Sequence, residues 1–375
     1  MKPFKCTSVL RRTLLSAASL ALLSLSQGAA AQAKEVLIGS TLPLTGVGAF
    51  YGESARNGAA LAVKHINAAG GINGTPLRVV FEDSKLEPKE AVTSLQKLID
   101  VHKVGIVMTA GSPVVLAQTP ISRERKVLLA NLAATSPRLR REGEYLINTH
   151  PLADTEAEAL ANMVAAEHKE YAILHVESDY GLDFFDAVSK AMEKKGVKLV
   201  AREQHKVGAV DFRTNMIKLK AANAPALISV SNVTETGHVA NQLREVGVKS
   251  QVYGPTFATS PNNLKIAPEA MNGWKGVRVM FDPARNDKAK AFAEAYQKEY
   301  NAPANSFAAF NYETTQLLAQ AIKAAGDSPE AVRNYLLSAK NLSGVLGDLE
   351  FDADRSVKFE LSRWTVVDGK IVGLK

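Results

Sequence analysis

The sequence predicts an α/β protein with two similar lobes, each a parallel sheet covered by helices on both faces. Two observations support this prediction. Short apolar runs typical of buried strands alternate with helical segments, and the alternation occurs in two successive series. No segment rich in Pro, Gly and Ser separates the series, so we expect short connections that act as a hinge.

Residues 1–33 have the composition of an export signal. A basic segment, Met1–Arg12, precedes an apolar stretch, Leu14–Leu25, and small residues then offer cleavage sites at Ala31 or Ala33. The apolar stretch is shorter than the roughly 20 residues that cross a bilayer. We therefore expect this segment to be removed after export rather than to anchor the protein.

The first series predicts four strands and three helices after the signal. Gly70 and Gly71 are suited to end its first helix, and Pro88 is suited to begin the second. In order, we expect strand 36–40, helix 52–69, strand 77–81, helix 88–100, strand 104–108, helix 113–123 and strand 127–131.

The second series begins after a short junction near residues 149–151. We expect helix 154–167, strand 171–176, helix 181–195, strand 197–204, helix 211–221, strand 226–230, helix 234–246 and strand 251–254. After a second junction near 281–283, the tail predicts helices 286–301, 306–325 and 329–338 and strands 345–351, 358–367 and 371–374. Ligands of open α/β sheets bind at the carboxyl ends of strands, so facing strand ends predict a cleft between the lobes.

The charge of the chain first suggests a polyanionic partner, because 45 basic and 38 acidic residues give a net charge of +7. The export signal holds four basic residues and no acid, so the rest of the chain carries only +3. We therefore expect no nucleic-acid partner. The only cysteine, Cys6, precedes the apolar stretch of the signal, a position that predicts neither a lipid anchor nor a disulfide or thiol nucleophile in the exported protein.

Motifs of catalysis are mostly missing from the sequence. Gly46, Gly48 and Gly52 form GxGxxxG, one residue longer than the dinucleotide fingerprint, and a flexible turn over a cleft explains them better. Neither a GxxxxGK[ST] phosphate loop nor a GxSxG nucleophile elbow occurs, and the seven histidines lack metal-binding spacing. We expect no enzyme activity, no cofactor and no metal.

Two turns instead predict capture of an anion. Gly111-Ser112-Pro113 lies where the third strand gives way to a helix, and Thr135-Ser136-Pro137 repeats the arrangement one strand later. Unsatisfied N–H groups and a hydroxyl at such a helix start are suited to a carboxylate. The same residues also form ordinary N-caps, and this alternative stays open.

With these turns in view, the chain resembles the periplasmic substrate-binding proteins of branched-chain amino acid ABC transporters, the leucine/isoleucine/valine-binding type. The resemblance covers essentially the whole chain after the signal. It is carried by residues 38–88, the turns AGSPV and AATSP, HVESDYG at 175–181 and YGPTF at 253–257.

The resemblance implies two doubly wound, Rossmann-like lobes joined by a three-stranded hinge, the type I periplasmic binding fold, closing around one ligand. It places the first lobe at 34–150 plus 282–345 and the second at 151–281 plus 346–375. It also implies a monomer in the periplasm, not lipid-anchored, that delivers a small carboxylate, a branched-chain or related amino acid, to an inner-membrane ABC permease. A ligand-sensing module for a signalling partner, or an exported α/β enzyme, are the alternatives.

The resemblance also implies site residues. Ser112 and Thr135 would bind the ligand's carboxylate through hydroxyl and backbone N–H groups, and the carbonyl of Ala133 would receive its ammonium. The other matches are the strand-end residues Ala110 and Gly111 and the aromatic contacts Tyr51, Tyr180 and Phe307. Core packing is the alternative role of the aromatic residues, and for Phe307 it is equally well supported.

One departure from the family pattern concerns the ligand's ammonium. Thr256 stands where leucine-type members carry an acid that pairs with it, and Asn232 replaces an aromatic residue. Loss of a charge-assisted hydrogen bond costs roughly 1.5–3 kcal/mol, a ten- to hundredfold loss of affinity. We hypothesise that the ligand is an aromatic or aliphatic acid without an α-amine, unless Glu177, Asp179 or Glu235 supplies the missing carboxylate.

Overall fold

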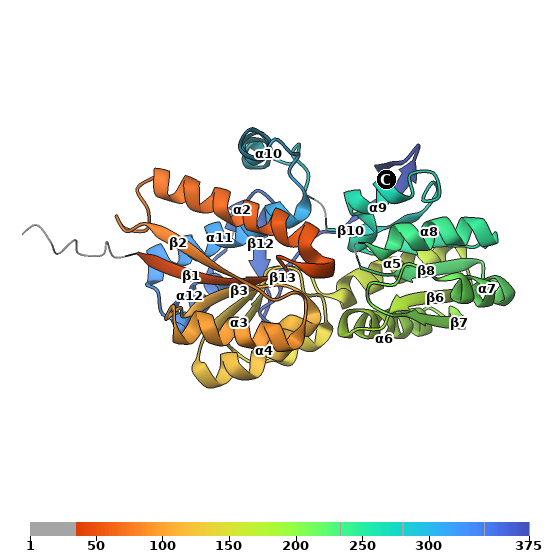
Figure 1. The fold of residues 1–375 in the computed structure, drawn as a ribbon, viewed down its shortest axis with the longest axis horizontal. Coiled ribbons are helices and arrows are strands. Elements are labelled where there is room, and N and C mark those ends of the chain that lie inside the picture. Colours follow the sequence, from red (N-terminus) through yellow and green to blue (C-terminus); the bar gives the residue numbers. More distant parts are fainter. Residues whose placement is uncertain (1–34, 233, 280, 341, 375) are drawn as a thin grey trace, which may run out of the picture.

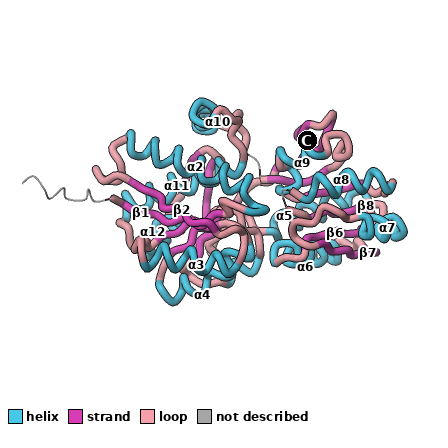
Figure 2. Tube along the Cα trace, viewed as in Figure 1, coloured by secondary structure: helices cyan, strands magenta, loops and turns pink. Residues whose placement is uncertain are grey.

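The computed structural model describes residues 35–374 except 233, 280 and 341, so the expected signal peptide at 1–33 lies outside the described residues. Two sheets stand side by side, each enclosed between helices (Figures 1 and 2). The first is wholly parallel, in the order β2-β1-β3-β4-β5. Its strands are β1 (Val36–Leu42), β2 (Leu77–Asp83), β3 (Ile106–Thr109), β4 (Leu128–Asn131) and β5 (Leu146–Asn148).

The second sheet repeats this order and extends it. Its parallel part runs β7-β6-β8-β9-β10, and two further strands, β14 and β15, pair antiparallel beyond β10. The parallel part confirms the predicted α/β lobe, and the antiparallel strands β14 and β15 extend its edge. The strands are β6 (Glu170–Val176), β7 (Lys198–His205), β8 (Ala226–Val230), β9 (Gln251–Gly254), β10 (Lys275–Arg278), β14 (Ser362–Val367) and β15 (Lys370–Leu374).

Helices cover both faces of each sheet because successive strand residues point to opposite sides. In β6, for example, Ile173 is buried against α5 and α6, whereas Leu174 is buried against α7 and α8. The helices of the first lobe are α2 (Ala49–Ala68), α3 (Pro88–Asp100), α4 (Ser112–Arg125), α10 (Asp287–Tyr300), α11 (Ser306–Ala325) and α12 (Pro329–Ser338). Those of the second are α5 (Ala153–Glu167), α6 (Asp179–Lys194), α7 (Arg213–Ala222), α8 (Glu235–Val246) and α9 (Pro261–Ile266).

Glycines of the GxGxxxG motif serve packing. A Cβ on Gly52 would lie 2.0 Å from the carbonyl oxygen of Pro43, and one on Gly48 would lie 2.7 Å from the Pro43 side chain. The short 3-10 turn η2 (Gly46–Gly48) and the start of α2 can therefore approach the end of β1 only because these residues lack side chains.

The chain passes between the lobes three times: after β5, after β10 and before β14. A small antiparallel sheet, β11 (Leu342–Gly344), β12 (Gly347–Phe351) and β13 (Val357–Lys358), precedes the last crossing. Leu346, Leu349 and Phe351 are buried in the core of the first lobe with α11 and α12. We expected residues 346–375 in the second lobe, but this packing keeps the chain in the first lobe until residues 359–361, where the last crossing lies. The same three residues interrupt the strand that we expected at 358–367.

Candidate ligand-binding site

A cavity of about 70 Å³ lies between the lobes, at the carboxyl ends of strands from both sheets. In each sheet it adjoins the position where the strand order reverses, between β1 and β3 and between β6 and β8. This is the place at which doubly wound sheets bind ligands. The first lobe contributes Tyr51, Leu86, Gly111, Ser112, Pro113 and Ala133 to its walls, and the second Ser178, Tyr180, Val207, Asn232 and Phe257.

The turn before α4 holds Ser112 at the cavity. Gly111 precedes it with φ +90°, a conformation that favours glycine. The hydroxyl oxygen of Ser112 accepts hydrogen bonds from the backbone N–H groups of Thr135 and Ser136, both at 3.2 Å. Because the Ser112 oxygen is an acceptor in both bonds, its own proton is available to a ligand.

The turn after β4 supplies a second hydroxyl. Thr135 is 3% exposed, and its Oγ1 has no hydrogen-bond partner among the described residues. Its backbone N–H, which we expected to bind the ligand, donates to Ser112 instead. Asn131, which sequence reasoning missed, holds this turn by accepting the N–H groups of Ala133 and Ala134 at 3.2 and 2.7 Å.

Four aromatic rings form a continuous row beside the cavity and cross from one lobe to the other. Tyr51 contacts Phe307 with ring centroids 5.3 Å apart, both in the first lobe. Phe307 stacks on Phe257 of the second lobe at 6.1 Å, and Phe257 meets Tyr180 at 5.2 Å. Phe257 was missed, although it belongs to the same YGPTF segment that drew attention to its neighbour.

Four predicted residues do not line the cavity: Thr135, described above, and Ala110, Phe307 and Thr256. Ala110 is buried in the apolar core of the first lobe, and Phe307 reaches the site only through its ring contacts. Thr256, in the 3-10 turn η4 (Thr256–Thr259), accepts the N–H of Val279 on its Oγ1 at 2.9 Å. Its backbone N–H donates to Glu156 Oε2 at 2.8 Å, so Thr256 joins α5 to the second crossing between the lobes.

The acids named as substitutes for the missing carboxylate have different surroundings. Glu177 pairs with Lys206 and Asp179 with Arg138, both in ion pairs near the surface. Glu235 is 1% exposed and lies in the first turn of α8. Of the three, only Glu235 is therefore buried near the cavity.

Glu156, which sequence reasoning missed, is a second buried acid near the cavity. It is 2% exposed, and burial raises the pKa of its carboxyl to about 7. The hydrogen bonds from Thr256 lower this pKa, but burial has the larger effect. The pKa of the Tyr180 phenol is also raised, first by burial and then by the charges of Glu156 and Glu235. Its hydroxyl has no partner in the described part of the chain.

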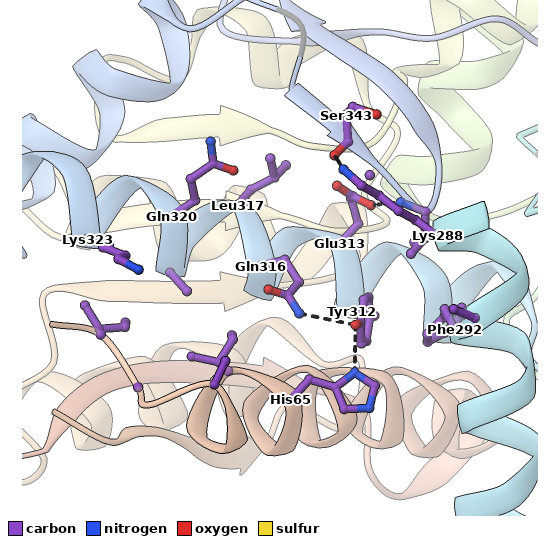
Figure 3. Close-up of a pocket in the computed structure, with 18 residues that line it drawn as sticks. His65, Lys288, Phe292, Tyr312, Glu313, Gln316, Leu317, Gln320, Lys323 and Ser343 are labelled. Carbon is purple, nitrogen blue, oxygen red and sulfur yellow. Dashed lines mark hydrogen bonds between the residues drawn. The ribbon is translucent and has the colours of Figure 1, made fainter. Parts of the chain in front are cut away.

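A second, larger cavity of about 570 Å³ lies in the first lobe between α2, α10, α11 and β11 (Figure 3). Its polar groups bond to one another: Tyr312 Oη lies 2.8 Å from His65 Nδ1 and accepts Gln316 Nε2 at 3.2 Å, and Lys288 donates to the Ser343 carbonyl at 2.7 Å. Among the described residues, no residue that lines this larger cavity has a buried polar side-chain atom without a hydrogen-bond partner. The interlobe cavity has one such residue in its wall, Tyr180, whose hydroxyl lacks a partner. The interlobe cavity is therefore the better ligand site.

Within residues 35–374, apart from the three left out, no group of three His, Cys, Asp or Glu side chains is placed to hold a metal ion. His175, at the end of β6, is fully buried, and its ring stacks on Phe185. Its Nε2 accepts a hydrogen bond from Arg202 Nε at 3.0 Å. No helix in the same part of the chain is long and apolar enough to cross a membrane.

Comparison with known proteins agrees with this fold and cleft. A solved structure, the branched-chain amino acid transporter substrate-binding protein LivJ of Streptococcus pneumoniae in complex with isoleucine, is 27% identical, with a TM-score of 0.82, and the match covers 91% of this chain and 100% of that one. A solute-binding protein of an ABC transporter from R. palustris, in complex with benzoate, has a TM-score of 0.83 with 91% and 96% covered; at 19% identity, this likeness concerns the fold alone.

Sequence comparison gives the family. The Leu/Ile/Val-binding protein homolog 3 of Brucella melitensis is 30% identical over 358 residues, which cover 92% of this chain and 95% of the relative. Residues 35–360 match the family model described as periplasmic binding protein. Because this match extends over most of the chain and includes both sides of the cleft, the chain belongs to the periplasmic binding protein family.

Proposed function

We propose that this protein is the extracytoplasmic solute-binding receptor of an ABC importer, and that it captures a small carboxylate ligand, a branched-chain or related amino acid, in the interlobe cavity. One observation carries the proposal: the cavity lies at the strand-order reversal of both sheets and is lined by both lobes. The Ser112 hydroxyl at the start of α4 and the Thr135 hydroxyl, which has no partner among the described residues, provide donors for a carboxylate.

Binding would proceed by hinge closure. A ligand held by Ser112 on one lobe and Tyr180 on the other stabilises the arrangement in which both contacts exist at once. The three crossings, after β5, after β10 and before β14, would serve as the hinge. The closed receptor would then be recognised by an inner-membrane permease.

The relatives support an amino-acid ligand more than an acid without an amine. The Brucella melitensis protein is named a Leu/Ile/Val-binding protein, and the Streptococcus pneumoniae protein is described in complex with isoleucine. The likeness to the benzoate-bound protein is restricted to the fold. Export through the signal at 1–33, a periplasmic location and a monomeric state belong to the same proposal.

A thermal-shift screen tests the function directly. Purified protein lacking residues 1–33 is heated with each of the common amino acids and with benzoate, keto acids and fatty acids. A ligand that binds the native state raises the melting temperature by mass action, by an amount that grows with its concentration. Absence of a shift with every compound in the panel would contradict the proposed ligand class.

A further inference from the structure

The loop between β2 and α3 brings one aliphatic side chain, that of Leu86, to the wall of the interlobe cavity. Leu86 adopts φ +63°, and Lys85 before it adopts φ +49°. This left-handed region is uncommon for residues other than glycine, because the Cβ atom crowds the following carbonyl oxygen. Two such residues in succession therefore give the loop a strained backbone beside the ligand site.

Hydrogen bonds to neighbouring segments hold the loop in this conformation. Asp83 Oδ1 accepts the N–H of Lys85 and that of Leu44, each at 2.9 Å, so one carboxylate joins the loop to the segment after β1. Ser84, which is fully buried, donates its N–H to the carbonyl of Leu42 at 2.9 Å. A strained backbone persists only where its surroundings fix it in this way, and such places are often functional sites.

The side chain of Leu86 packs on the turn that carries Ser112. A Cβ on Gly111 would overlap Cδ1 of Leu86, so the leucine lies directly on the backbone that precedes Ser112. Leu86 is half-buried, and it belongs to none of the apolar cores formed by the described residues. Packing within a core therefore does not offset the strain of this backbone, and the place that the side chain occupies is the cavity wall.

Leu86 also differs in kind from the rest of the first-lobe wall. The other first-lobe residues that line the cavity are one aromatic ring and members of the two strand-end turns: Tyr51, Gly111, Ser112, Pro113 and Ala133. Leu86 is thus the one long aliphatic side chain in this wall as the structure describes it. Because the cavity has a volume of only about 70 Å³, the isopropyl group of Leu86 takes up space that is significant for a small ligand.

We propose that Leu86 is a specificity-determining residue, which limits the length of the ligand's apolar part by filling the first-lobe side of the cavity. This inference rests on the proposed function and adds a size limit to it. A ligand that is too long has to displace Leu86, and the hydrogen bonds of Asp83 and Ser84 resist that displacement. Each methylene group buried within the limit raises affinity about fourfold, whereas a group that overlaps the wall lowers it.

Two homologous series of ligands test this limit. Calorimetry measures the dissociation constants of straight-chain L-α-amino acids from alanine to 2-aminooctanoate and of straight-chain carboxylates from acetate to octanoate. With wild-type protein, we expect affinity to rise with chain length to an optimum and then to fall. Leu86→Ala should move the optimum to ligands that are longer by about one to three carbon atoms, and at the new optimum the variant should bind about tenfold or more tightly than wild type.

Three further variants sharpen the test. Leu86→Gly removes the same isopropyl group and also relieves the left-handed strain, so it should move the optimum in the same direction as Leu86→Ala. Leu86→Phe enlarges the side chain and should move the optimum to shorter ligands. Val101→Ala is the control, since this exposed apolar residue ends α3 in the same lobe and does not line the cavity; it should keep the wild-type optimum.

An optimum that stays at the wild-type length in both Leu86→Ala and Leu86→Gly would overturn the inference and leave the proposed receptor function standing. Loss of all binding in both variants, with melting curves that show folded protein, would also overturn it, because Leu86 would then be needed for the site to form. Wild-type affinity that rises through the longest member of a series would show that no length limit exists. Failure of every compound in both series to bind wild-type protein would instead contradict the proposed function itself.

Discussion

The guanidinium Nε of Arg138 lies 3.0 Å from Oδ2 of Asp183, across the boundary between the two lobes. Arg138 belongs to the 3-10 turn η3 (Pro137–Arg141) of the first lobe, and Asp183 to α6 of the second. Arg138 also pairs with Asp179, and Ser136 Oγ donates to Asp183. These contacts exist only while the lobes are together, so they stabilise the closed arrangement beside the ligand cavity.

Arg138→Ala should therefore weaken ligand binding without touching the ligand. Ion pairs at partly exposed sites contribute about 0.2–1 kcal/mol each, so we expect the dissociation constant to rise about two- to tenfold. The difference from wild type should shrink in high salt, which screens the pairs. Calorimetry at low and high ionic strength measures both effects.

Arg123→Ala is the control for this change. Arg123 pairs with Glu142, and both residues belong to the first lobe. It should leave the dissociation constant unaffected. An Arg138→Ala protein that binds as tightly as wild type would show that the interlobe pairs do not favour closure.

The two hydroxyls of the first lobe should determine carboxylate binding. Each hydrogen bond to a charged group contributes roughly 1.5–3 kcal/mol, so the double variant Ser112→Ala, Thr135→Ala should lose at least a hundredfold in affinity. Ser328→Ala removes the N-cap hydroxyl of α12 away from the cavity and serves as the matched control. Retained affinity in the double variant, measured by calorimetry on folded protein, would reject these residues as the carboxylate site.

The stacked pair Phe257 and Phe307 should couple closure to binding. Aromatic pairs contribute about 0.5–1.5 kcal/mol beyond the area that they bury. Phe257→Ala and Phe307→Ala should each weaken ligand binding, and the double variant should lose less than the sum of the two, since their contact can be lost only once. Phe185→Ala, on the His175 side of α6, is the control and should change stability without this coupling. Strictly additive losses would show that the rings act independently.

Local features of the site were predictable, whereas long-range ones were not. The turn at Ser112 was predicted because a strand end, Gly111 and Pro113 lie next to one another in sequence. Glu156 looks like an ordinary acid in a first helical turn, where such residues are common. Its burial arises from contact with Thr256, 100 residues along the chain. The residues that neighbour Glu156 in the sequence therefore give no indication that it is buried.

The same difference between local and long-range features explains which strands were predicted and which were missed. Strands with several apolar residues were predicted within a few positions, but β5 has only three residues and β10 contains Gly276 and two charged ends. Both were missed because they are defined by pairing with β4 and β9 rather than by composition. Phe359 and Leu361 continue the apolar pattern between β13 and β14. Because of this continuity, the sequence predicted one uninterrupted strand and not the third crossing between the lobes.

The buried acids should make stability depend on pH. Burial raises the pKa of Glu156 and of Glu313 from 4.5 to about 7. The folded protein therefore holds protons on these carboxyls that the unfolded chain releases above pH 4.5. The stabilisation is fully present below pH 4.5 and is lost as the pH rises through 7, by about 3 kcal/mol for each group. Urea unfolding of ligand-free protein between pH 4.5 and 8.5 measures this fall.

Glutamine variants assign the effect to its residues. Glu156→Gln keeps an acceptor for Thr256 N–H, and Glu313→Gln keeps one for Val345 N–H, but neither side chain titrates. Each variant should be more stable than wild type at pH 8.5. In each, the loss of unfolding free energy between pH 4.5 and 8.5 should be smaller by the contribution of the replaced carboxyl group, about 3 kcal/mol. Glu203→Gln, whose parent acid pairs with Lys218, should follow the wild-type profile. If Glu156→Gln kept the full wild-type dependence, titration of the Glu156 carboxyl would not be a cause of the fall in stability.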